Sequence, residues 1–512
     1  MSQLNSRFPM GVTLRRLLSG ASFVGCADIR VHRATHRSLE CDTDSLFAAL
    51  RGRDFDGHHF IRDAIDHGAS AVLVEYPQTD VSVPQCVVRN TRQAYARICS
   101  ALHGDPSRCL SVVGVTGTNG KTTTTWLVRS ILQAAGIQTG LLGTIEYNDA
   151  IHVEPSALTT PDSITLAEWL SSMVSHGTTH AAIEMSSHAL DQFRCAGTLI
   201  DAAVITNITH DHLDYHFDYD AYRASKLHIF EHLKPGGVAV LNADDPGSIS
   251  CVAHAPGQVI TFGLRNSADV SATLLKQSTR GTDFVLTAGT QRIDVHTPMV
   301  GEHNVMNCLA AAAATLYAGI SLPDIAAGIE ALTDVPGRLE RIDCGQTFNI
   351  FVDYAHTDDA LQRAIAAAKA ITAGRVICVF GAGGDRDRTK RPLLGRAGAT
   401  ADLPVVTSDN PRSEPPAQII DEILTGMPGD TDLHVEVDRA EAIRWALAAA
   451  GPQDTVLVAG KGHETEQVIG KQRLHFDDRD VIRRMVVDIL DNSNDISDAH
   501  FAARRKNVGQ IV

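Results

Sequence analysis

The chain has 512 residues, of which 44% are hydrophobic and 21% are charged, and its formal net charge is -15. This length exceeds what one compact core accommodates and predicts about three domains, and the composition is that of a folded globular protein. A nonspecific nucleic-acid binder normally carries a basic excess, so the acidic balance argues against that class.

The first residues lack the long apolar segment of a signal peptide, and no run reaches the ~18 apolar residues that a membrane span needs. The ten cysteines are scattered and form no Cys-x-x-Cys pair. That pattern is typical of buried or free thiols in a reducing compartment. We therefore expect a cytoplasmic protein with neither a membrane nor a nucleic-acid partner.

Three stretches of alternating strand and helix patterns follow one another. In the first, a helix-like segment at 60–67 precedes a β-rich run at 70–75, and turn residues at 104–107 mark a boundary. A second boundary is expected at 335–337, and the tail after Asp491 is polar. In the later stretches the predicted strands are 110–115, 181–183, 202–206, 348–352, 376–380, 403–407 and 455–458. Apolar strands separated by helices predict an α/β fold with parallel, doubly wound sheets.

A glycine-rich loop joins the strand at 110–115 to a predicted helix that starts near Thr122. Its sequence is Gly117-Thr-Asn-Gly-Lys-Thr122, followed by Thr123. Glycines let backbone N–H groups surround phosphate oxygens, the Lys121 ammonium can neutralise them, and the Thr122 hydroxyl can hold Mg²⁺. The alternative is a glycine-rich turn followed by an ordinary surface lysine, but the strand and helix on either side favour a phosphate-binding loop.

Polar residues also follow the next two predicted strands. Glu184-Met-Ser-Ser-His188 comes after 181–183, and Thr206-Asn-Ile-Thr-His-Asp-His-Leu-Asp214 comes after 202–206. Ligands bind at the carboxyl ends of strands in such sheets, so Glu184 is the better candidate for Mg²⁺, with His212 as a less usual ligand. Taken alone, polar strand ends more often serve as helix caps or hydrogen-bonding groups. A zinc site is less favoured, because no tight His/Cys spacing recurs.

These motifs, taken in order, resemble the Mur ligase family over nearly all of the chain after about Leu110. The further matching segments are Thr159-Thr-Pro161, Asp211-His-Leu-Asp214, Gly301-Glu-His-Asn-Val-Met-Asn307, Pro336-Gly-Arg338, Asp353-Tyr-Ala-His356, Gly383-Gly-Asp-Arg-Asp387, Asp409-Asn-Pro-Arg412 and Gly460-Lys-Gly-His-Glu464. Any one of them is weak, whereas the ordered set is specific. The last two point to the branch that adds diaminopimelate.

The resemblance implies three α/β domains and a tail: a UDP-substrate domain at 1–107, a central P-loop ATPase domain with a parallel sheet at 108–336, a Rossmann-like amino-acid domain at 337–490, and 491–512. It implies an ATP-dependent ligase that adds meso-diaminopimelate to UDP-N-acetylmuramoyl-L-alanyl-D-glutamate through an acyl phosphate. Closure of the third domain would exclude water from that intermediate. A monomer that binds only these small molecules is expected.

The resemblance also assigns residues to the site. Lys121, Glu184, His212 and Lys226 would be catalytic. Mg²⁺ would be bound by Thr122, Glu184, His212 and Lys226. Of these, Lys226 would be carbamylated by CO₂. ATP would contact the loop residues Gly117, Thr118, Asn119, Gly120, Lys121, Thr122 and Thr123, together with Asn304, Asn307, Arg338, Asp353 and His356. Without the resemblance, Lys226 is a solvated helix lysine and Asn304 a helix cap.

The substrate residues follow in the same way. The muramoyl dipeptide would contact Ser38, Thr159, Thr160, Ser186, Gln192 and Arg194. Diaminopimelate would contact Arg391, Asp409, Asn410, Pro411, Arg412, Gly460 and Glu464. Taken alone, Thr159 to Pro161 is a turn, and Asn410-Pro411 is a common turn pair. Near the UDP end the family's Asp-Ser-Arg and Pro-Gly are replaced by Thr35-His-Arg-Ser38 and Thr43-Asp44.

Other functions remain open at this point. The lysine-adding ligase of the same family differs only in the amino acid. Folylpolyglutamate synthase shares the ATPase features but lacks the Asp-Asn-Pro-Arg and Gly-Lys-Gly-His-Glu pair. A phosphate-loop switch protein would hydrolyse nucleotide without any amino acid, and an inactive scaffold would not need Lys121, Glu184 and His212.

Overall fold

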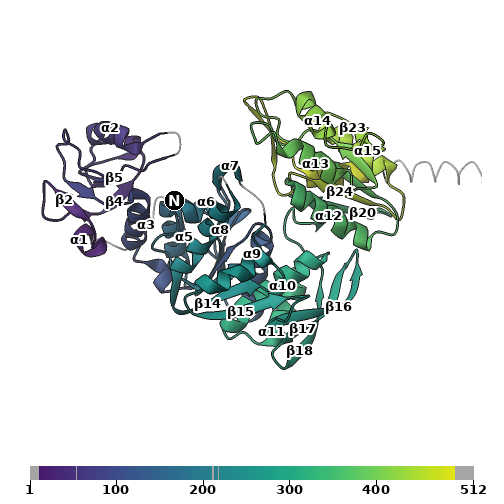
Figure 1. Cartoon of the computed structure of the whole chain (residues 1–512), viewed down its shortest axis with the longest axis horizontal. Helices are drawn as coiled ribbons and strands as arrows, with labels where there is room; N and C mark the ends of the chain where they lie inside the picture. The colour runs from purple at the N-terminus through teal and green to yellow at the C-terminus, as the bar shows by residue number, and fades with distance from the viewer. Residues whose placement is uncertain (1–10, 53–54, 210–212, 217, 490–512) are drawn as a thin grey trace, which may run out of the picture. The chain divides into compact units, whose positions relative to one another are not determined.

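The structure, a computed structural model, describes residues 11–52, 55–209, 213–216 and 218–489. The chain, coloured by residue number in Figure 1, divides into two compact units. The first unit contains residues up to 272 together with 286–293 and 306–331, and the second contains 273–285, 294–305 and the residues from 332 onward. Among the described residues, no helix combines the length and the apolar character needed to cross a membrane.

The first unit begins with a small α/β sheet. Its elements are β1 (Val12–Thr13), α1 (Leu14–Leu17), β2 (Ser22–Val24), β3 (Arg30–Val31), β4 (Arg33–Thr35), η1 (Ser38–Glu40), β5 (Ser45–Ala48), η2 (Gly57–Phe60), α2 (Ile61–Asp66), β6 (Ala71–Val74), β7 (Gln85–Val87) and α3 (Thr91–Leu102). The strand order is β2-β7-β6-β5-β4, with β4 to β7 parallel and β2 antiparallel at one edge. Along β6, Leu73 packs in one core cluster and Val72 in another, because successive side chains of a strand point to opposite faces.

A larger sheet follows. Its elements are η3 (Pro106–Arg108), β8 (Ser111–Thr116), α4 (Lys121–Ala134), β9 (Thr139–Leu142), β10 (Glu146–Asn148), β11 (Val153–Pro155), α5 (Ser163–Ser175), β12 (His180–Glu184), α6 (Ser187–Asp191), β13 (Ile200–Ile205), α7 (Leu213–His216), α8 (Tyr219–Leu227), η4 (His228–His232), β14 (Leu233–Asn242), α9 (Pro246–Ile249), η5 (Ser250–His254), β15 (Gln258–Gly263), β16 (Val270–Ser278), β17 (Gly281–Ala288), β18 (Gln291–Thr297), α10 (Glu302–Tyr317) and α11 (Leu322–Ala331). The order is β11-β10-β9-β12-β8-β13-β14-β15-β16-β17-β18.

The central strands of this sheet run parallel, as the sequence predicts. β9, β12, β8, β13, β14, β15 and β16 pair in parallel, whereas β10 and β11 extend one edge in antiparallel fashion. Helix α4 packs against α11, where the Ser130 hydroxyl donates to the Gly328 carbonyl at 2.7 Å. A Cβ at Gly328 would lie 2.3 Å from Ile131 Cα, so glycine permits this close approach. The contact fixes the helix that follows the phosphate loop.

The second unit contains a doubly wound sheet. Its elements from 332 onward are β19 (Glu340–Arg341), β20 (Asn349–Asp353), α12 (Asp358–Ile371), β21 (Val376–Phe380), α13 (Lys390–Gly398), β22 (Leu403–Val406), α14 (Pro416–Leu424), β23 (His434–Val435), α15 (Arg439–Ala449), β24 (Thr455–Ala459), β25 (Glu466–Ile469) and β26 (Gln472–His475). The strand order is β19-β20-β24-β21-β22-β23. All neighbouring strands from β20 to β23 in this order, β24 included, run parallel. Two core clusters cover its two faces. The segments after β20, β21, β22 and β24 therefore meet at one edge of the sheet, where ligands bind in such folds.

Candidate active site

The predicted phosphate loop connects β8 to α4 in the first unit. Gly117 and Gly120 have φ values of 153° and 86°, in the left-handed region that favours glycine. A Cβ at Gly117 would lie 1.8 Å from Thr206 Oγ1, and one at Gly120 would lie 2.3 Å from Asn307 Oδ1. The loop is thus packed against the end of β13 and against α10, and it leaves no room for side chains at these two positions.

Lys121 begins α4 and folds back over the loop. Its Nζ donates to the carbonyls of Gly117 at 2.8 Å and of Thr118 at 2.9 Å. The next residue, Thr122, is buried, and its hydroxyl lies 3.1 Å from Glu184 Oε2. The structure therefore brings the cationic residue of the loop and the predicted metal ligands to the same end of the sheet.

Glu184, the last residue of β12, is fully buried, and hydroxyl and amide groups surround its carboxylate. Oε1 accepts from the Thr144 backbone N–H at 2.7 Å, and Oε2 accepts from the Thr144 hydroxyl at 3.0 Å as well as from Thr122. A buried carboxylate with oxygen donors beside it is the kind of group that Mg²⁺ accepts. His212, the second predicted ligand, lies outside the described residues.

Lys226 lies near the end of α8 and is also buried, with 1% of its surface exposed. Its Nζ lies 4.4 Å from the centroid of the Tyr222 ring, one helical turn earlier. The Tyr222 hydroxyl in turn lies 3.0 Å from the Thr118 hydroxyl in the phosphate loop. The lysine is therefore not a solvated helix residue, and Tyr222 connects its surroundings to the loop.

The residues predicted to hold the muramoyl dipeptide form a second hydrogen-bonded group around Thr160. The Thr160 hydroxyl donates to the Glu184 carbonyl at 2.7 Å and accepts from the Ser186 backbone N–H at 3.0 Å. Arg194 Nη1 donates to the Thr160 carbonyl at 3.2 Å, and its other nitrogens donate to Gln192 Oε1. Thr159 Oγ1 accepts from Thr144 at 3.2 Å. Only Ser38, a half-buried residue at the start of η1, belongs to the smaller N-terminal sheet.

The predicted nucleotide residues belong to both units. Asn307 lies in the first unit against the phosphate loop, whereas Asn304, Arg338, Asp353 and His356 belong to the second. Asn304 is the third residue of α10, and its side-chain amide donates to the Val300 carbonyl at 2.9 Å.

Around β20, Arg338 lies over the Tyr354 ring at 4.8 Å, and His356 contacts the same ring with centroids 4.6 Å apart. Asp353 accepts from the backbone N–H groups of Leu339 and Ala355. Burial raises the pKa of Asp353, although Arg338 acts in the opposite direction. The ring of His463 also contacts the Tyr354 ring, with centroids 4.9 Å apart. Burial, followed by the charge of Arg338, lowers the pKa of His463 to about 3, so its ring is neutral at neutral pH.

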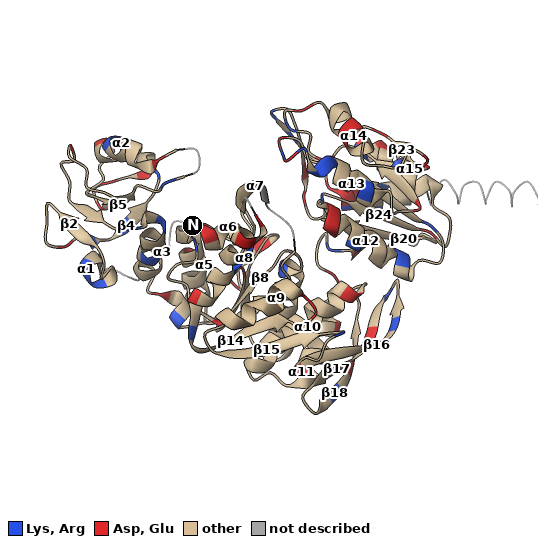
Figure 2. Ribbon diagram, in the orientation of Figure 1, with Lys and Arg blue, Asp and Glu red and all other residues tan. Residues whose placement is uncertain are grey.

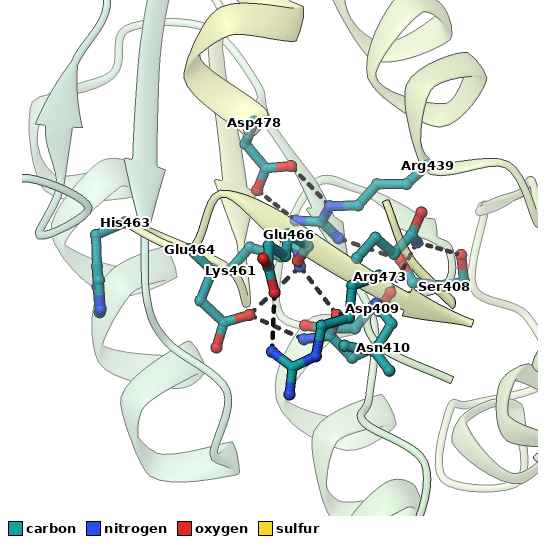
Figure 3. A network of polar contacts seen from close by, with 12 residues as sticks. Ser408, Asp409, Asn410, Arg439, Lys461, His463, Glu464, Glu466, Arg473 and Asp478 are labelled. Atoms are coloured by element: carbon teal, nitrogen blue, oxygen red, sulfur yellow. Dashed lines mark hydrogen bonds and ion pairs between the residues drawn. The ribbon is translucent and has the colours of Figure 1, made fainter. Parts of the chain in front are cut away.

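The two motifs that point to diaminopimelate come together beside β22 and β24 (Figure 3). Asn410 Nδ2 donates to Glu464 Oε2 at 2.8 Å. Lys461 is fully buried, and its Nζ donates to Asn410 Oδ1 at 3.2 Å, to Glu464 Oε2 at 3.3 Å and to the Glu466 carbonyl at 2.6 Å. Asn410 is thus already engaged by the protein through both ends of its amide, while Glu464 is about one third exposed.

Neighbouring residues hold this group in place. Asp409 and Pro411 are buried, and Asp409 Oδ2 would lie 2.7 Å from a Cβ at Gly460. Behind them, Arg439 and Asp478 form a fully buried ion pair, and Arg439 also donates to the Ala459 carbonyl at 2.9 Å. The pair of motifs therefore rests on a rigid polar base.

Arg412 and Arg391 have different surroundings. Arg412 has a left-handed φ of 51°, and its Nη1 donates to the Gly384 carbonyl at 2.7 Å. Arg391 on α13 is 1% exposed. It forms ion pairs with Glu414 and with Glu422, the latter on the adjoining helix α14. Figure 2 shows basic residues on α13 and acidic residues on α14. Its hydrogen bonds lower the pKa of Glu414 to about 2. In this structure Arg391 therefore fixes the Glu414 segment, and its contact with an amino-acid substrate stays a prediction.

Sequence reasoning passed over four side chains of these groups: Tyr222, Tyr354, Lys461 and His463. Each lies inside a motif or one helical turn from a predicted residue, so its position gave a usable signal. Tyr222 precedes Lys226 by one turn of α8, and Tyr354 follows Asp353 directly. Lys461 and His463 stand within Gly460 to Glu464.

Comparison with known proteins gives a consistent result. Family models match residues 30–103 (Mur ligase family, catalytic domain), 115–315 (Mur ligase middle domain) and 337–462 (Mur ligase, glutamate ligase domain). A Bacillus licheniformis protein named UDP-N-acetylmuramoyl-L-alanyl-D-glutamate--2,6-diaminopimelate ligase is 40% identical over 477 residues, which are 91% of this chain and 97% of the relative. A protein of the same name from Solibacter usitatus is 44% identical over 446 residues, 86% of this chain and 90% of the relative.

Solved structures agree. One structure of a protein with that name has a TM-score of 0.68 and 31% identity, covering 93% of this chain and 99% of the other. A Mycobacterium tuberculosis folylpolyglutamate synthase has a TM-score of 0.59 at 19% identity, covering 72% of this chain and 92% of the other, and shares the fold. With relatives well above 30% identity along almost their whole length, the chain belongs to the Mur ligase family.

Proposed function

We propose that the protein is an ATP-dependent ligase that joins meso-diaminopimelate to the D-glutamate carboxylate of UDP-N-acetylmuramoyl-L-alanyl-D-glutamate, a step of peptidoglycan synthesis. The observation that carries this proposal is the contact between Asn410 and Glu464, which unites the two motifs typical of the diaminopimelate-adding branch. The relatives named for that reaction support it. ATP and a nucleotide-linked substrate favour a cytoplasmic location, and we propose that the protein acts there as a monomer on small molecules.

In the proposed reaction the substrate carboxylate attacks the γ-phosphorus of ATP, which gives an acyl phosphate and ADP. The amine of diaminopimelate then attacks the acyl carbon, loses a proton and expels phosphate. Such steps depend on positioning and charge neutralisation more than on covalent chemistry by the protein. Lys121 suits this role, because its ammonium already lies over the phosphate loop, where it donates to loop carbonyls whose place phosphate oxygens can take.

Mg²⁺ would be held near Thr122 and Glu184. The fit is supported by the Thr122 hydroxyl and the buried Glu184 carboxylate, hard oxygen donors 3.1 Å apart at the end of the loop. When bound, the ion would neutralise phosphate charge. Around it, the Thr144 N–H and hydroxyl keep the carboxylate of Glu184 in a fixed orientation.

Lys226 is proposed to carry a carbamate. Its amine would add to the carbon of CO₂ and release one proton, which turns a cation into an anion with two oxygens. Burial supports this change, because removal from water disfavours the charged ammonium and the neutral amine is the reactive form. The carbamate would then help to orient Mg²⁺ beside the phosphate loop, to which Tyr222 already connects this helix.

The amino-acid site is proposed to lie beside Arg412 and Glu464. The planar fork of Arg412 can pair with the distal carboxylate of diaminopimelate, and the exposed part of Glu464 can accept from its ammonium group. Asn410 would act mainly by holding Glu464, since the amide of Asn410 is engaged within the protein. Thr159, Thr160, Ser186, Gln192 and Arg194 are proposed for the muramoyl dipeptide.

An omission experiment tests the proposal. The protein is incubated with ATP, Mg²⁺, the UDP-linked muramoyl dipeptide and meso-diaminopimelate, and phosphate release is followed together with the mass of the nucleotide-sugar product. We expect phosphate release and a tripeptide product in the complete mixture, and neither without the dipeptide. Phosphate release that needs neither the dipeptide nor the amino acid would instead indicate a nucleotide-hydrolysing switch protein.

A further inference from the structure

A cluster of one carboxylate and two imidazoles lies away from the groups described above. Asp149 follows β10, His152 lies in the turn between β10 and β11, and His176 follows α5. His176 Nδ1 lies 3.0 Å from Asp149 Oδ2, and His152 Nδ1 lies 3.3 Å from the same oxygen. Two histidines from different elements thus each direct their Nδ1 atom at the same carboxylate oxygen.

The spacing of these atoms matches that of ligands around a tetrahedral metal ion. With metal–ligand distances of 2.0–2.1 Å, ligand atoms of a tetrahedral zinc site lie about 3.3 Å from one another. The two nitrogen–oxygen distances fall at or just below this value, and all three ligand atoms lie within 4.8 Å of one another. An ion bound by all three residues would draw the two imidazole rings closer together, because the three ligand atoms now lie within 4.8 Å of one another.

The burial of the three residues also suits such a site. The Asp149 side chain is 1% exposed, that of His176 27% and that of His152 64%, so one side of the cluster faces solvent, where water can supply a fourth ligand. Hydrogen bonds hold the carboxylate in place: Oδ1 accepts from the backbone N–H groups of Ile151 and His152, and Oδ2 accepts from Ser172 at 2.5 Å. Hydrogen bonds that hold a ligand residue in one orientation in this way favour metal binding.

We propose that Asp149, His152 and His176 form a structural site for a borderline-soft divalent ion of the Zn²⁺ class. Two imidazoles and one carboxylate favour such ions over Mg²⁺, which prefers oxygen ligands.

The ion would connect the turn of the β10–β11 hairpin to the end of α5. The same hairpin supports the segment that leads to Thr159 and Thr160, because the Tyr147 hydroxyl donates to the Leu158 carbonyl at 2.6 Å and accepts from the Leu158 N–H at 3.0 Å. The role assigned to the ion is to stabilise this hairpin, and the inference does not depend on which amino acid the enzyme adds.

The test uses the full chain with Co²⁺ as a spectroscopic probe, in excess Mg²⁺ to occupy oxygen-rich sites. Wild type is compared with His152→Gln, with His176→Gln and with the double variant, while Asp149 is kept because it holds backbone amides of the turn. The control is His67→Gln, which alters an exposed histidine 3.4 Å from the Asp63 carboxylate on α2. Circular dichroism checks that each variant is folded.

We expect wild type and His67→Gln to take up about one equivalent of Co²⁺ more than the double variant, with the strong visible absorption of tetrahedral coordination. We also expect Zn²⁺ to raise the melting temperature of these two proteins, an effect that the double variant loses. Equal uptake by wild type and the double variant, or no uptake by wild type, would overturn the proposal and leave a hydrogen-bonded Asp–His–His cluster.

Discussion

At the scale of single residues, Lys461 organises the proposed amino-acid site. It is fully buried, and its three acceptors belong to Asn410, Glu464 and Glu466. Lys461→Met should leave buried acceptors unsatisfied, at a cost of about 1–3 kcal/mol, and should loosen Glu464 by removing one of its two donors. We therefore expect a lower urea midpoint and a raised KM for diaminopimelate with an unchanged KM for ATP. The control variant Lys471→Met, at an exposed lysine, should change neither the urea midpoint nor the KM for diaminopimelate. Equal behaviour of the two variants would contradict the role of Lys461.

Arg412 carries the proposed recognition of the distal carboxylate. Arg412→Lys keeps the charge but removes the planar fork, and it also removes the donor to the Gly384 carbonyl. We expect the kcat/KM for diaminopimelate to fall by at least ~10-fold, the loss that follows from about 1.4 kcal/mol of binding energy. Binding of ATP, followed by calorimetry, should be unchanged. If ligation proceeds at the wild-type rate, the carboxylate lies elsewhere.

His463 makes stability depend on pH. Burial and the charge of Arg338 lower its pKa to about 3, and its buried Nδ1 has no hydrogen-bond partner among the described residues. The unfolded chain binds a proton near pH 6.5 and the folded chain does not, so this contribution to stability is full above that pH and is lost as the pH falls towards 3. The slope is at most about 1.4 kcal/mol per pH unit for one proton.

His463→Phe keeps the ring beside Tyr354 and cannot titrate. Urea unfolding at about pH 7.5 and about pH 5 should therefore show a smaller loss of stability for this variant than for wild type. His475→Phe, a control at an exposed histidine of β26, should keep the pH dependence of wild type. A His463→Phe variant with the full acid sensitivity of wild type would place the responsible proton on another group.

The sequence identified many residues of these groups but not their partners. Lys121, Thr122 and Glu184 could be predicted to converge because each stands at the carboxyl end of a strand or directly after a glycine-rich loop. The internal pairing of Arg391 with Glu414 and Glu422 could not, because those residues are 23 and 31 positions away and meet only when α13 and α14 pack together. For the same reason the contact between Asn410 and Lys461, which are 51 positions apart, could not be predicted.

At the scale of elements, the phosphate loop depends on close packing at Gly117. An alanine there would place Cβ 1.8 Å from Thr206 Oγ1, whereas Gly136, which also has a left-handed φ, has nothing within 4 Å of such a Cβ. Gly136→Ala should therefore cost only about 1 kcal/mol of backbone strain. Gly117→Ala should weaken ATP binding by more than ~10-fold in addition to lowering stability, because the loop must move. Equal effects of the two substitutions on ATP binding would contradict this account.

Burial explains only part of which strands the sequence predicted, because the buried strand β9 and the buried half of β14 were not predicted. The largely buried strands β8, β12, β13, β21 and β24 were predicted within a residue or two of their ends, because apolar runs between helices are a strong signal. The strands β16, β17 and β18 and the hairpin β25–β26 were not predicted. They mix buried and exposed positions and follow one another without intervening helices, so no apolar run distinguishes them from loops.

At the scale of the whole molecule, the order of the motifs carries more information than any single motif. The three family models match successive segments in the order that the sequence motifs predict, and the relatives cover almost the whole chain. The fold alone does not select the substrate, since a folylpolyglutamate synthase shares it at 19% identity. The central claim is therefore the identity of the added amino acid, which depends on the Arg412 and Glu464 region.

Steady-state ligation with meso-diaminopimelate and with L-lysine, at saturating ATP and UDP-linked muramoyl dipeptide, tests that claim most directly. Lysine lacks the distal carboxylate and would leave the Arg412 fork without its partner, and a site built for such hydrogen bonds can reject the incomplete analogue by ~10⁴-fold. We predict a kcat/KM for diaminopimelate that exceeds the value for lysine by a factor of this order. A preference for lysine, or equal use of both amino acids, would contradict the assignment.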